Sequence, residues 1–277
     1  MKKLSILKKV LLITLTVTVL TLFTAVNSGA AVAGGEGSTI ARIQENKILR
    51  VVCILSTSPF GMVNAQGKPE GFDVDIAIEL AKSMGVEVEI IDSVEAANRV
   101  PYITSGKADV AIATLGITLS RAQVIAFTDP YIRDGQVIVA PKGSQIKTLE
   151  DLKGKKVGLV RGGPQDLLVE KYLKDSEILR YGTVTDTFTA LKQGKADAVL
   201  EGKSISDYQV ATLAPELEVV SDPFTTLYWG FGAAKGDNDW INYLNLFIRE
   251  LNISGKRAEL YAKWFGGAEP AKLTPTY

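Results

Sequence analysis

A pair of glycines and the arginine before them form one candidate anion site in this sequence. Gly162 and Gly163 stand at the start of a predicted helix, directly after Arg161. Glycines let backbone N–H groups approach an anion closely, and a helix N-terminus carries partial positive charge. Pro164 follows and lacks an N–H, which removes one of these donors. Arg161 could extend this site, or it could be an ordinary surface arginine on a loop.

The composition excludes several other kinds of site. The sequence contains no histidine and a single cysteine, Cys53. Histidine-based catalytic triads, histidine metal sites and zinc clusters are therefore excluded, and no intramolecular disulfide can form. Cys53 lies in the apolar run over residues 49–55, where we expect a buried, unreactive thiol. We expect no metal and no cofactor.

The charge of the chain argues against a nucleic-acid partner. The sequence has 31 basic and 31 acidic residues, but four lysines belong to the first nine residues. The remainder is therefore mildly acidic, with four more acidic than basic residues. A surface that binds nucleic acid needs clustered, excess Lys and Arg.

Residues 1–33 are typical of a secretory signal peptide. Lysines form a positive end, residues 10–26 are uncharged, and small residues follow, with Ala31 and Ala33 at the positions that signal peptidase requires. Cleavage is expected before Gly34, which predicts a periplasmic mature protein. The alternative is an uncleaved anchor helix, but this run of 17 residues is shorter than the roughly 20 that a span prefers.

Strand-like and helix-like segments alternate along the remaining chain, which predicts an α/β fold. The tetrapeptide Gly-Lys-Ala-Asp occurs at 106–109 and again at 194–197, each time between a predicted helix and a predicted strand. This repetition is a weak indication of two related lobes. The predicted strands cover residues 49–55, 86–90, 109–112, 156–160 and 197–200, and the predicted helices 73–84, 97–105, 164–174, 185–193, 241–251 and 256–265.

Four motifs resemble the polar-amino-acid family of ABC-importer solute-binding proteins, which have the periplasmic-binding-protein type II fold. Each motif is weak alone, but their order and spacing cover nearly all of residues 40–266. The motifs are Gly-Phe-Asp-Val-Asp-Ile-Ala over 71–77, Thr-Leu-Gly-Ile-Thr-x-x-Arg over 114–121 with Phe-Thr-Asp-Pro-Tyr over 127–131, Leu-Lys-Gly-Lys-Lys-Val-Gly over 152–158 leading to Arg-Gly-Gly over 161–163, and Ala-Lys-Trp-Phe-Gly over 262–266.

The resemblance implies two α/β lobes, each a sheet flanked by helices, with a ligand cleft between them. Lobe 1 is expected over residues 38–138 and 226–277, and lobe 2 over 139–225. The chain would cross between the lobes near 136–141 and 225–233, and the ligand would close them by a hinge motion. The resemblance also implies an ABC permease as membrane partner, and we expect a monomer.

The resemblance assigns Arg121 to the ligand α-carboxylate, because this residue matches the arginine that the family uses. Thr114 and the backbone around Gly116 would supply the other donors, although the family usually has Ser or Thr at position 116. Arg99, in Asn-Arg-Val-Pro over 98–101, resembles an arginine that approaches the ligand in members binding acidic ligands. The alternative for both arginines is a solvated helix surface.

Two departures from the family pattern concern the rest of the ligand. The aromatic residue that often stacks on the ligand is replaced by Thr57, and Phe60 is the expected apolar wall of the cleft. The family aspartate that holds the α-amine is replaced by Gly202, directly after Glu201. Either Glu201 receives the amine, or the ligand has none. A buried ammonium group without an acidic partner would be costly.

The expected cleft therefore holds up to three arginines and one clear acid. Two ligand carboxylates would balance these charges better than one, which favours an acidic amino acid or a related dicarboxylate. The alternatives are an enzyme resembling the cyclohexadienyl dehydratases, with Asp166 as proton donor, and a ligand-sensing receptor subunit. We expect a binding protein without catalytic residues, since Asp166 is explained more simply as a first-turn helix residue.

Overall fold

The structure is a computed structural model that describes residues 38–267, all within one compact unit. The predicted signal segment, residues 1–33, lies outside the described residues. Among the described helices, none combines the length and the hydropathy that crossing a bilayer would take.

The first sheet has five strands in the order β4-β1-β5-β12-β6. β1 runs parallel to β4 and β5, while β12 runs antiparallel to β5 and β6. Val51 and Cys53 of β1 pack into one apolar cluster and Val52 into another, because successive side chains point to opposite faces of a sheet. The strands are β1 (Ile48–Cys53), β4 (Glu87–Asp92), β5 (Val110–Ala111), β6 (Ala126–Asp134) and β12 (Leu227–Ala233).

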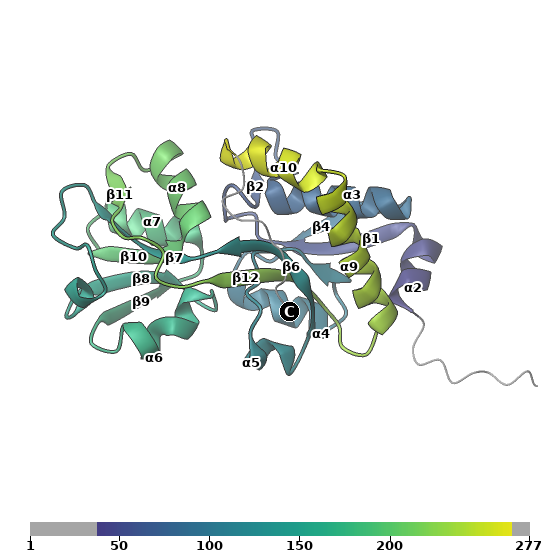
Figure 1. Cartoon of the computed structure of the whole chain (residues 1–277), viewed down its shortest axis with the longest axis horizontal. Helices are drawn as coiled ribbons and strands as arrows, with labels where there is room; N and C mark the ends of the chain where they lie inside the picture. The colour runs from purple at the N-terminus through teal and green to yellow at the C-terminus, as the bar shows by residue number, and fades with distance from the viewer. Residues whose placement is uncertain (1–37, 268–277) are drawn as a thin grey trace, which may run out of the picture. The chain divides into compact units, whose positions relative to one another are not determined.

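Helices cover both faces of this sheet (Figure 1). α3, α9 and α10 form one layer, in which α3 packs on β1 and β4, and α9 packs on β6. α4 packs on β1, β5 and β12. The elements are α2 (Thr39–Asn46), the strand pair β2 (Met62–Val63) and β3 (Pro69–Glu70), α3 (Phe72–Met84), the 3₁₀ helix η1 (Ala96–Asn98), α4 (Arg99–Thr104), α5 (Leu119–Ala122), α9 (Asn238–Ile253) and α10 (Lys256–Phe265).

The second sheet also has five strands, in the order β11-β7-β10-β8-β9. α7 packs on β8, β9 and β10, and α8 packs on β7, β10 and β11. The strands are β7 (Gln136–Pro141), β8 (Lys156–Val160), β9 (Glu177–Tyr181), β10 (Ala198–Gly202) and β11 (Leu217–Val219). The helices are η2 (Glu150–Leu152), η3 (Gln165–Leu168), α6 (Val169–Tyr172), α7 (Val184–Lys192) and α8 (Lys203–Thr212).

Two neighbouring chain segments join the sheets. Gly135 alone separates β6 from β7, and residues 220–226 lead from β11 to β12. The backbone N–H of Gln136 donates to Thr225 Oγ1 at 3.0 Å, and the N–H of Phe224 donates to the Gln136 carbonyl at 3.0 Å. A Cβ on Gly135 would lie 2.6 Å from the Thr225 carbonyl oxygen, so only glycine allows the segments to pass this closely.

The repeated tetrapeptide forms the same turn in both sheets. Gly106 and Gly194 have φ values of 70° and 68°, which favour glycine. The N–H of Asp109 donates to β1, and the N–H of Asp197 donates to β8. The two aspartates differ in their surroundings, because the Asp109 carboxylate is buried among arginines whereas Asp197 is exposed.

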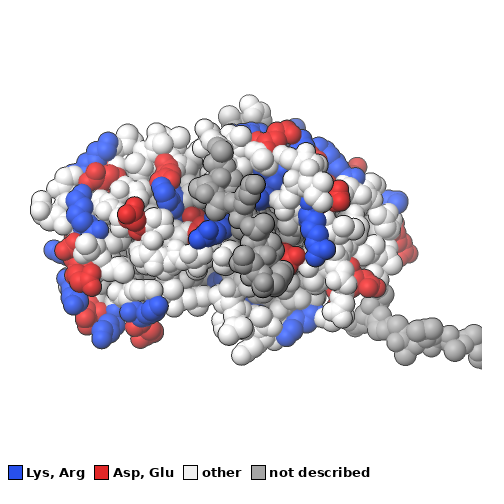
Figure 2. Space-filling view, viewed as in Figure 1, with Lys and Arg blue, Asp and Glu red and all other residues white. Residues whose placement is uncertain are grey.

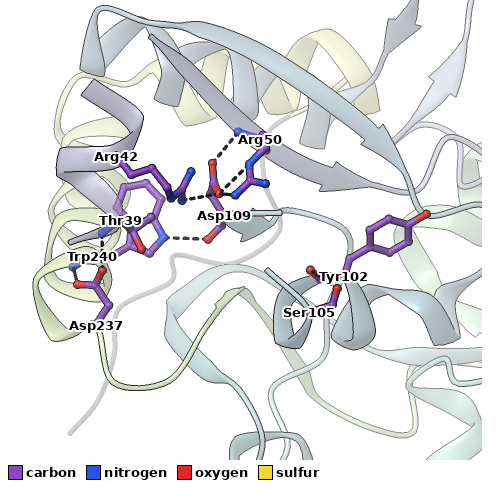
Figure 3. A network of polar contacts seen from close by, with 8 residues as sticks. All are labelled: Thr39, Arg42, Arg50, Tyr102, Ser105, Asp109, Asp237 and Trp240. Carbon is purple, nitrogen blue, oxygen red and sulfur yellow. Dashed lines mark hydrogen bonds and ion pairs between the residues drawn. The ribbon is translucent and has the colours of Figure 1, made fainter. Parts of the chain in front are cut away.

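The buried aspartate of the first copy holds several elements together (Figure 3). Asp109 forms ion pairs with Arg42 at 2.7 Å and Arg50 at 2.6 Å. Its carboxylate also accepts the backbone N–H of Arg50, and its carbonyl accepts the indole N–H of Trp240. The contacts join α2, β1 and α9 at one end of the first sheet.

The structure differs from the prediction in the segment after β8. A helix was expected over 164–174, but η3 and α6 have only four residues each. The Asp166 side chain turns back and accepts the N–H of Gly162 at 3.0 Å, and Leu173 leaves the helical conformation with a φ of −129°.

On the face shown in Figure 2, basic and acidic side chains are interspersed rather than segregated into a basic patch.

Candidate ligand-binding site

Arg121 lies on the short helix α5 and points away from solvent. Thr118 caps this helix by accepting the backbone N–H of Arg121 at 3.2 Å. The Arg121 guanidinium donates from Nη1 to the Gly116 carbonyl and from Nη2 to the Gly162 carbonyl, both at 2.8 Å. Burial lowers the pKa of this guanidinium, so its positive charge is poorly solvated.

Arg99 is the first residue of α4 and is 1% exposed. Three carbonyls near the first sheet, those of Ala96, Ala113 and Thr114, accept its N–H groups at 2.7–2.9 Å. Its Nη2 donates to the Gly162 carbonyl at 3.2 Å. Burial, and then repulsion from Arg121, lower the pKa of Arg99 to about 9, so the group stays charged at neutral pH.

The two guanidinium groups therefore both donate to one uncharged carbonyl oxygen, that of Gly162, in the loop that follows β8 of the second sheet. Gly162 holds this oxygen in place with a φ of 68°, while its own N–H is bound by Asp166. The N–H of Gly163 donates to the Val160 carbonyl. Both glycine N–H groups thus bond within the loop itself, and it is the Gly162 carbonyl that faces the arginines.

Thr114 lies beside the arginine pair in a left-handed conformation, with a φ of 46°. Its N–H donates to Asp73 Oδ2 at 3.0 Å and contacts Tyr131 Oη at 3.2 Å, and Tyr131 in turn donates to Asp73 at 2.8 Å. Asp73 lies in the first turn of α3 but does not cap this helix. Because its side chain turns inward, Asp73 ties α3 to the loop after β5, and burial raises its pKa to about 7.

Gly116 contributes its carbonyl to Arg121, as described above. A Cβ at this position would lie 3.1 Å from Arg121 Nη1 and 3.5 Å from Pro164 Cγ. The glycine therefore leaves room for the guanidinium and for the loop of the second sheet. Thr114, Gly116, Arg99, Arg121 and Gly162 are the predicted site residues that direct contacts bring together.

Other predicted site residues lie apart from this cluster. Thr57 is 4% exposed and forms a backbone turn with Phe60 and Gly61. Phe60 is fully buried, with its ring centroid 5.1 Å from that of Trp229 and 5.0 Å from that of Phe265. Arg161 is exposed, and its backbone N–H donates to the Tyr181 carbonyl at 2.9 Å.

Glu201 is buried near the C-terminal end of β10, the central strand of the second sheet. It is 3% exposed. Its Oε2 accepts the amide of Gln165 at 3.0 Å, and its Oε1 accepts the N–H of Gly202 at 2.8 Å. Burial, and to a lesser extent Asp134, raise its pKa to about 7, while the hydrogen bonds from Gly202 and Gln165 and the charge of Arg99 oppose the change. Glu201 is therefore within electrostatic reach of both an acid and an arginine.

Several buried polar groups in this region were not predicted from the sequence. Gln165 Oε1, Trp229 Nε1 and both amide atoms of Gln136 are buried with no hydrogen-bond partner among the described residues. Asp134, at the end of β6, has a pKa raised to about 7 by burial. An uncharged Gln or Trp in an apolar run gives no sequence signal of this kind, because only the partners show whether it is satisfied.

Comparisons with known proteins identify the family of this chain. Residues 49–267 match the family model of the bacterial extracellular solute-binding proteins, family 3. The chain belongs to this family. The two sheets flanked by helices correspond to the two-lobed fold of its members.

Similar family 3 proteins are named for amino acids. The ABC transporter glutamine-binding protein GlnH of Bacillus subtilis is 31% identical over 242 residues, which are 86% of this chain and 88% of that protein. A mutant of ArgBP from T. maritima is 37% identical, with a TM-score of 0.78, and is matched over 83% of this chain and 100% of its own.

A third relative is connected by its description with the dehydratase alternative. The ancestral amino acid-binding protein AncCDT-1, described as a precursor of cyclohexadienyl dehydratase, is 31% identical with a TM-score of 0.77. It is matched over 82% of this chain and 100% of its own. These family 3 relatives are binding proteins by name. Within residues 38–267, no group of three His, Cys, Asp or Glu residues could hold a metal ion.

Proposed function

We propose that this protein is the periplasmic receptor of an ABC importer and that it binds an acidic amino acid between its two lobes. One observation carries the ligand proposal: the Arg99 and Arg121 guanidinium groups meet at the uncharged Gly162 carbonyl. Neither arginine forms an ion pair with a carboxylate among the described residues. Arg99 is buried and Arg121 half-buried, and two such positive charges without a carboxylate partner favour an anion at the point where they meet.

On this proposal each arginine binds a different carboxylate of the ligand. Arg121 reaches across to the loop of the second sheet from a capped helix and would hold the α-carboxylate, together with Thr114 and the backbone at Gly116. Arg99 is fixed by three carbonyls and presents its Nη2 toward the same point. It would meet the second carboxylate. On this proposal the ligand replaces the Gly162 carbonyl as the partner of both groups and thereby controls closure of the lobes.

The alternative activities receive less support. Asp166, the acid that a dehydratase reading would need, accepts the Gly162 N–H and forms an ion pair with Arg180 at 2.9 Å. Both oxygens of this carboxylate are therefore engaged in structural contacts, Oδ2 with the Gly162 N–H and Oδ1 with Arg180. An assay with prephenate and arogenate tests this alternative, and a sensor role would be tested by the partner that co-purifies. We expect a monomer that docks on a permease.

Calorimetric titration of the ligand-stripped protein tests the ligand class. Glutamate or aspartate should bind at least about 10-fold more tightly than glutamine, asparagine, arginine or lysine, because only the acidic pair offers Arg99 a second carboxylate. Arg99→Met should remove this preference, and Arg99→Lys, which keeps the charge, should retain part of it. Arg121→Met should weaken every amino acid by at least about 100-fold.

Arg249→Met is the matched control, since Arg249 lies on α9 with its side chain 66% exposed. It should bind as the unchanged protein does. Glutamine is a fair competitor, because a relative is named for it. Tightest binding of glutamine, arginine or lysine would contradict the acidic ligand, while failure of every amino acid to bind would contradict the receptor function.

A further inference from the structure

The junction of the two sheets carries a second cluster of polar groups, opposite in charge to the arginine pair. Asp134 ends β6 and Glu201 lies on β10. Burial raises the pKa of both carboxyl groups, and Asp134 also raises the pKa of Glu201. Neither carboxylate forms an ion pair with Lys or Arg among the described residues. Gln165 Oε1 adds a buried acceptor without a partner. This acceptor-rich cluster is suited to a cation.

Gly202 makes the placement of Asp134 possible. A Cβ at position 202 would lie 2.7 Å from Asp134 Oδ2, closer than a carbon and a carboxylate oxygen can approach without displacement. Any other residue at 202 would therefore push Asp134 away. Gly202 is also the N-cap of α8 and has no side chain to cap it. Asp134 takes that place from the neighbouring sheet.

The Asp134 carboxylate retains unused acceptor capacity. Oδ1 accepts the N–H of Gly135 at 2.8 Å. The N–H of Ser204 is 3.4 Å from both oxygens, which is at the long limit of a hydrogen bond. No shorter hydrogen bond to Oδ2 is found among the described residues, although a contact with the Ser204 side chain also lowers the pKa of Asp134. Asp134 also lines a cavity of about 500 Å³ between α8 and α10, and this cavity is separate from the arginine pair, because neither Arg99 nor Arg121 lines it.

Trp229 connects this cluster with the arginine pair. Its backbone forms a β-bridge with Gly116, whose carbonyl binds Arg121. Its ring atoms Cζ2 and Cη2 lie 3.4 and 3.5 Å from the Cβ position of Gly202. Trp229 therefore contacts Gly116, which binds Arg121, through its backbone, and its ring lies beside Gly202, next to Asp134. The buried Nε1 of Trp229, two bonds from Cζ2, has no partner among the described residues.

We propose that Asp134 receives the ammonium group of the amino-acid ligand and that Gly202 is the residue that makes room for it. This inference rests on the proposed function and identifies the residue that selects for an amine. The ligand would lie along Trp229, with its α-carboxylate on Arg121 and its ammonium group on Asp134. Family members carry an acidic residue at the position of Gly202, and this chain lacks it. On this proposal Asp134, at the end of β6, supplies the acidic group instead.

Glu201 is the competing candidate, because it also lies at this junction. Its two oxygens accept short bonds from Gln165 and Gly202, at 3.0 and 2.8 Å. Its carboxylate is therefore held as part of the wall, whereas Asp134 Oδ2 is not. The charged neighbour that raises the pKa of Asp134 is Asp207, while hydrogen bonds from Gly135 and Ser204 lower it, and Asp134 in turn raises the pKa of Glu201. A bound ammonium group would relieve the repulsion among these carboxylates.

Paired calorimetric titrations with glutamate and its amine-free analogue glutarate test the inference. The unchanged protein should prefer glutamate. Asp134→Asn, which can still cap α8, should weaken glutamate by at least about 30-fold and leave glutarate nearly unchanged, because only glutamate loses a buried charge partner. Asp134→Gly combined with Gly202→Asp should restore the preference, since the carboxylate then returns to the same place from position 202.

Two controls separate the alternatives. Asp207→Asn removes a charge from the same region, on α8, and should keep the preference for glutamate. If Glu201→Gln loses the preference and Asp134→Asn keeps it, Glu201 receives the amine and the inference is overturned. Equal binding of glutamate and glutarate by the unchanged protein would also overturn it, while leaving the carboxylate site intact. Binding of neither would instead defeat the proposed function. Thermal unfolding of each variant shows that it is folded.

Discussion

At the scale of single residues, Arg99 and Arg121 are the two positive groups of the candidate ligand-binding site. Arg99 and Arg121 look like ordinary helix residues in the sequence, and only the family resemblance singled them out. In the structure their guanidinium groups share one carbonyl oxygen, that of Gly162. Arg161, which the sequence made a third candidate, is exposed. The charge balance of the site therefore involves two arginines on one side and Asp134 and Glu201 on the other.

The buried carboxyl groups predict how stability depends on pH. Asp73, Asp134 and Glu201 each have a pKa raised to about 7 in the folded protein, against about 4 in an unfolded chain. The folded state therefore holds more protons between these values, so this contribution to stability is complete at low pH and is lost as pH rises through about 7.

Calorimetric unfolding of the ligand-free protein should show a melting temperature that falls between pH 5 and pH 8. The slope should be shallower in Asp134→Asn, which removes one of the three groups. Exposed carboxylates with lowered pKa values, such as Asp151 and Glu218, act in the opposite direction but mainly below about pH 4.5. A melting temperature that rises from pH 5 to pH 8 would contradict the assignment of these groups.

At the scale of elements, local patterns in the sequence predicted most of the strands and helices. The apolar run at 49–55 forms β1, and the spaced apolar residues from 241 to 251 form the buried face of α9. The segment 164–174 was expected to be one helix, because apolar spacing alone does not show that Asp166 turns back to bind Gly162. Contacts between distant segments, such as Asp73 with Thr114 or Asp134 with Gly202, leave no local signal.

The repeated Gly-Lys-Ala-Asp turn offers a matched pair of substitutions. Asp109→Asn should lower the free energy of unfolding by about 2 kcal/mol, because it leaves Arg42 and Arg50 facing a neutral amide at a buried position. Asp197→Asn, in the other copy, should cost less than about 1 kcal/mol, since its exposed carboxylate accepts only the N–H of Lys156. Urea unfolding measures both changes. Equal losses would show that the burial of Asp109 adds nothing.

At the scale of the whole molecule, the two sheets meet through a few specific contacts. Gly135 and Thr225 bring the two crossing segments together, and the Gly162 carbonyl is the group of the second sheet's loop that both arginines bind. The membership in family 3 gives the two-lobed fold and the general role. The identity of the ligand depends instead on which groups the arginines and the acceptor cluster meet, and those groups come from opposite sides of the junction.

Native mass spectrometry of the protein, expressed as the full chain and purified without denaturation, tests the central claim most directly. The account predicts one bound small molecule per chain, released on denaturation and identified as an amino acid with a second carboxylate. It should be absent from Arg121→Met purified in the same way. A bound molecule that carries no carboxylate, or one retained equally by Arg121→Met, would contradict the account.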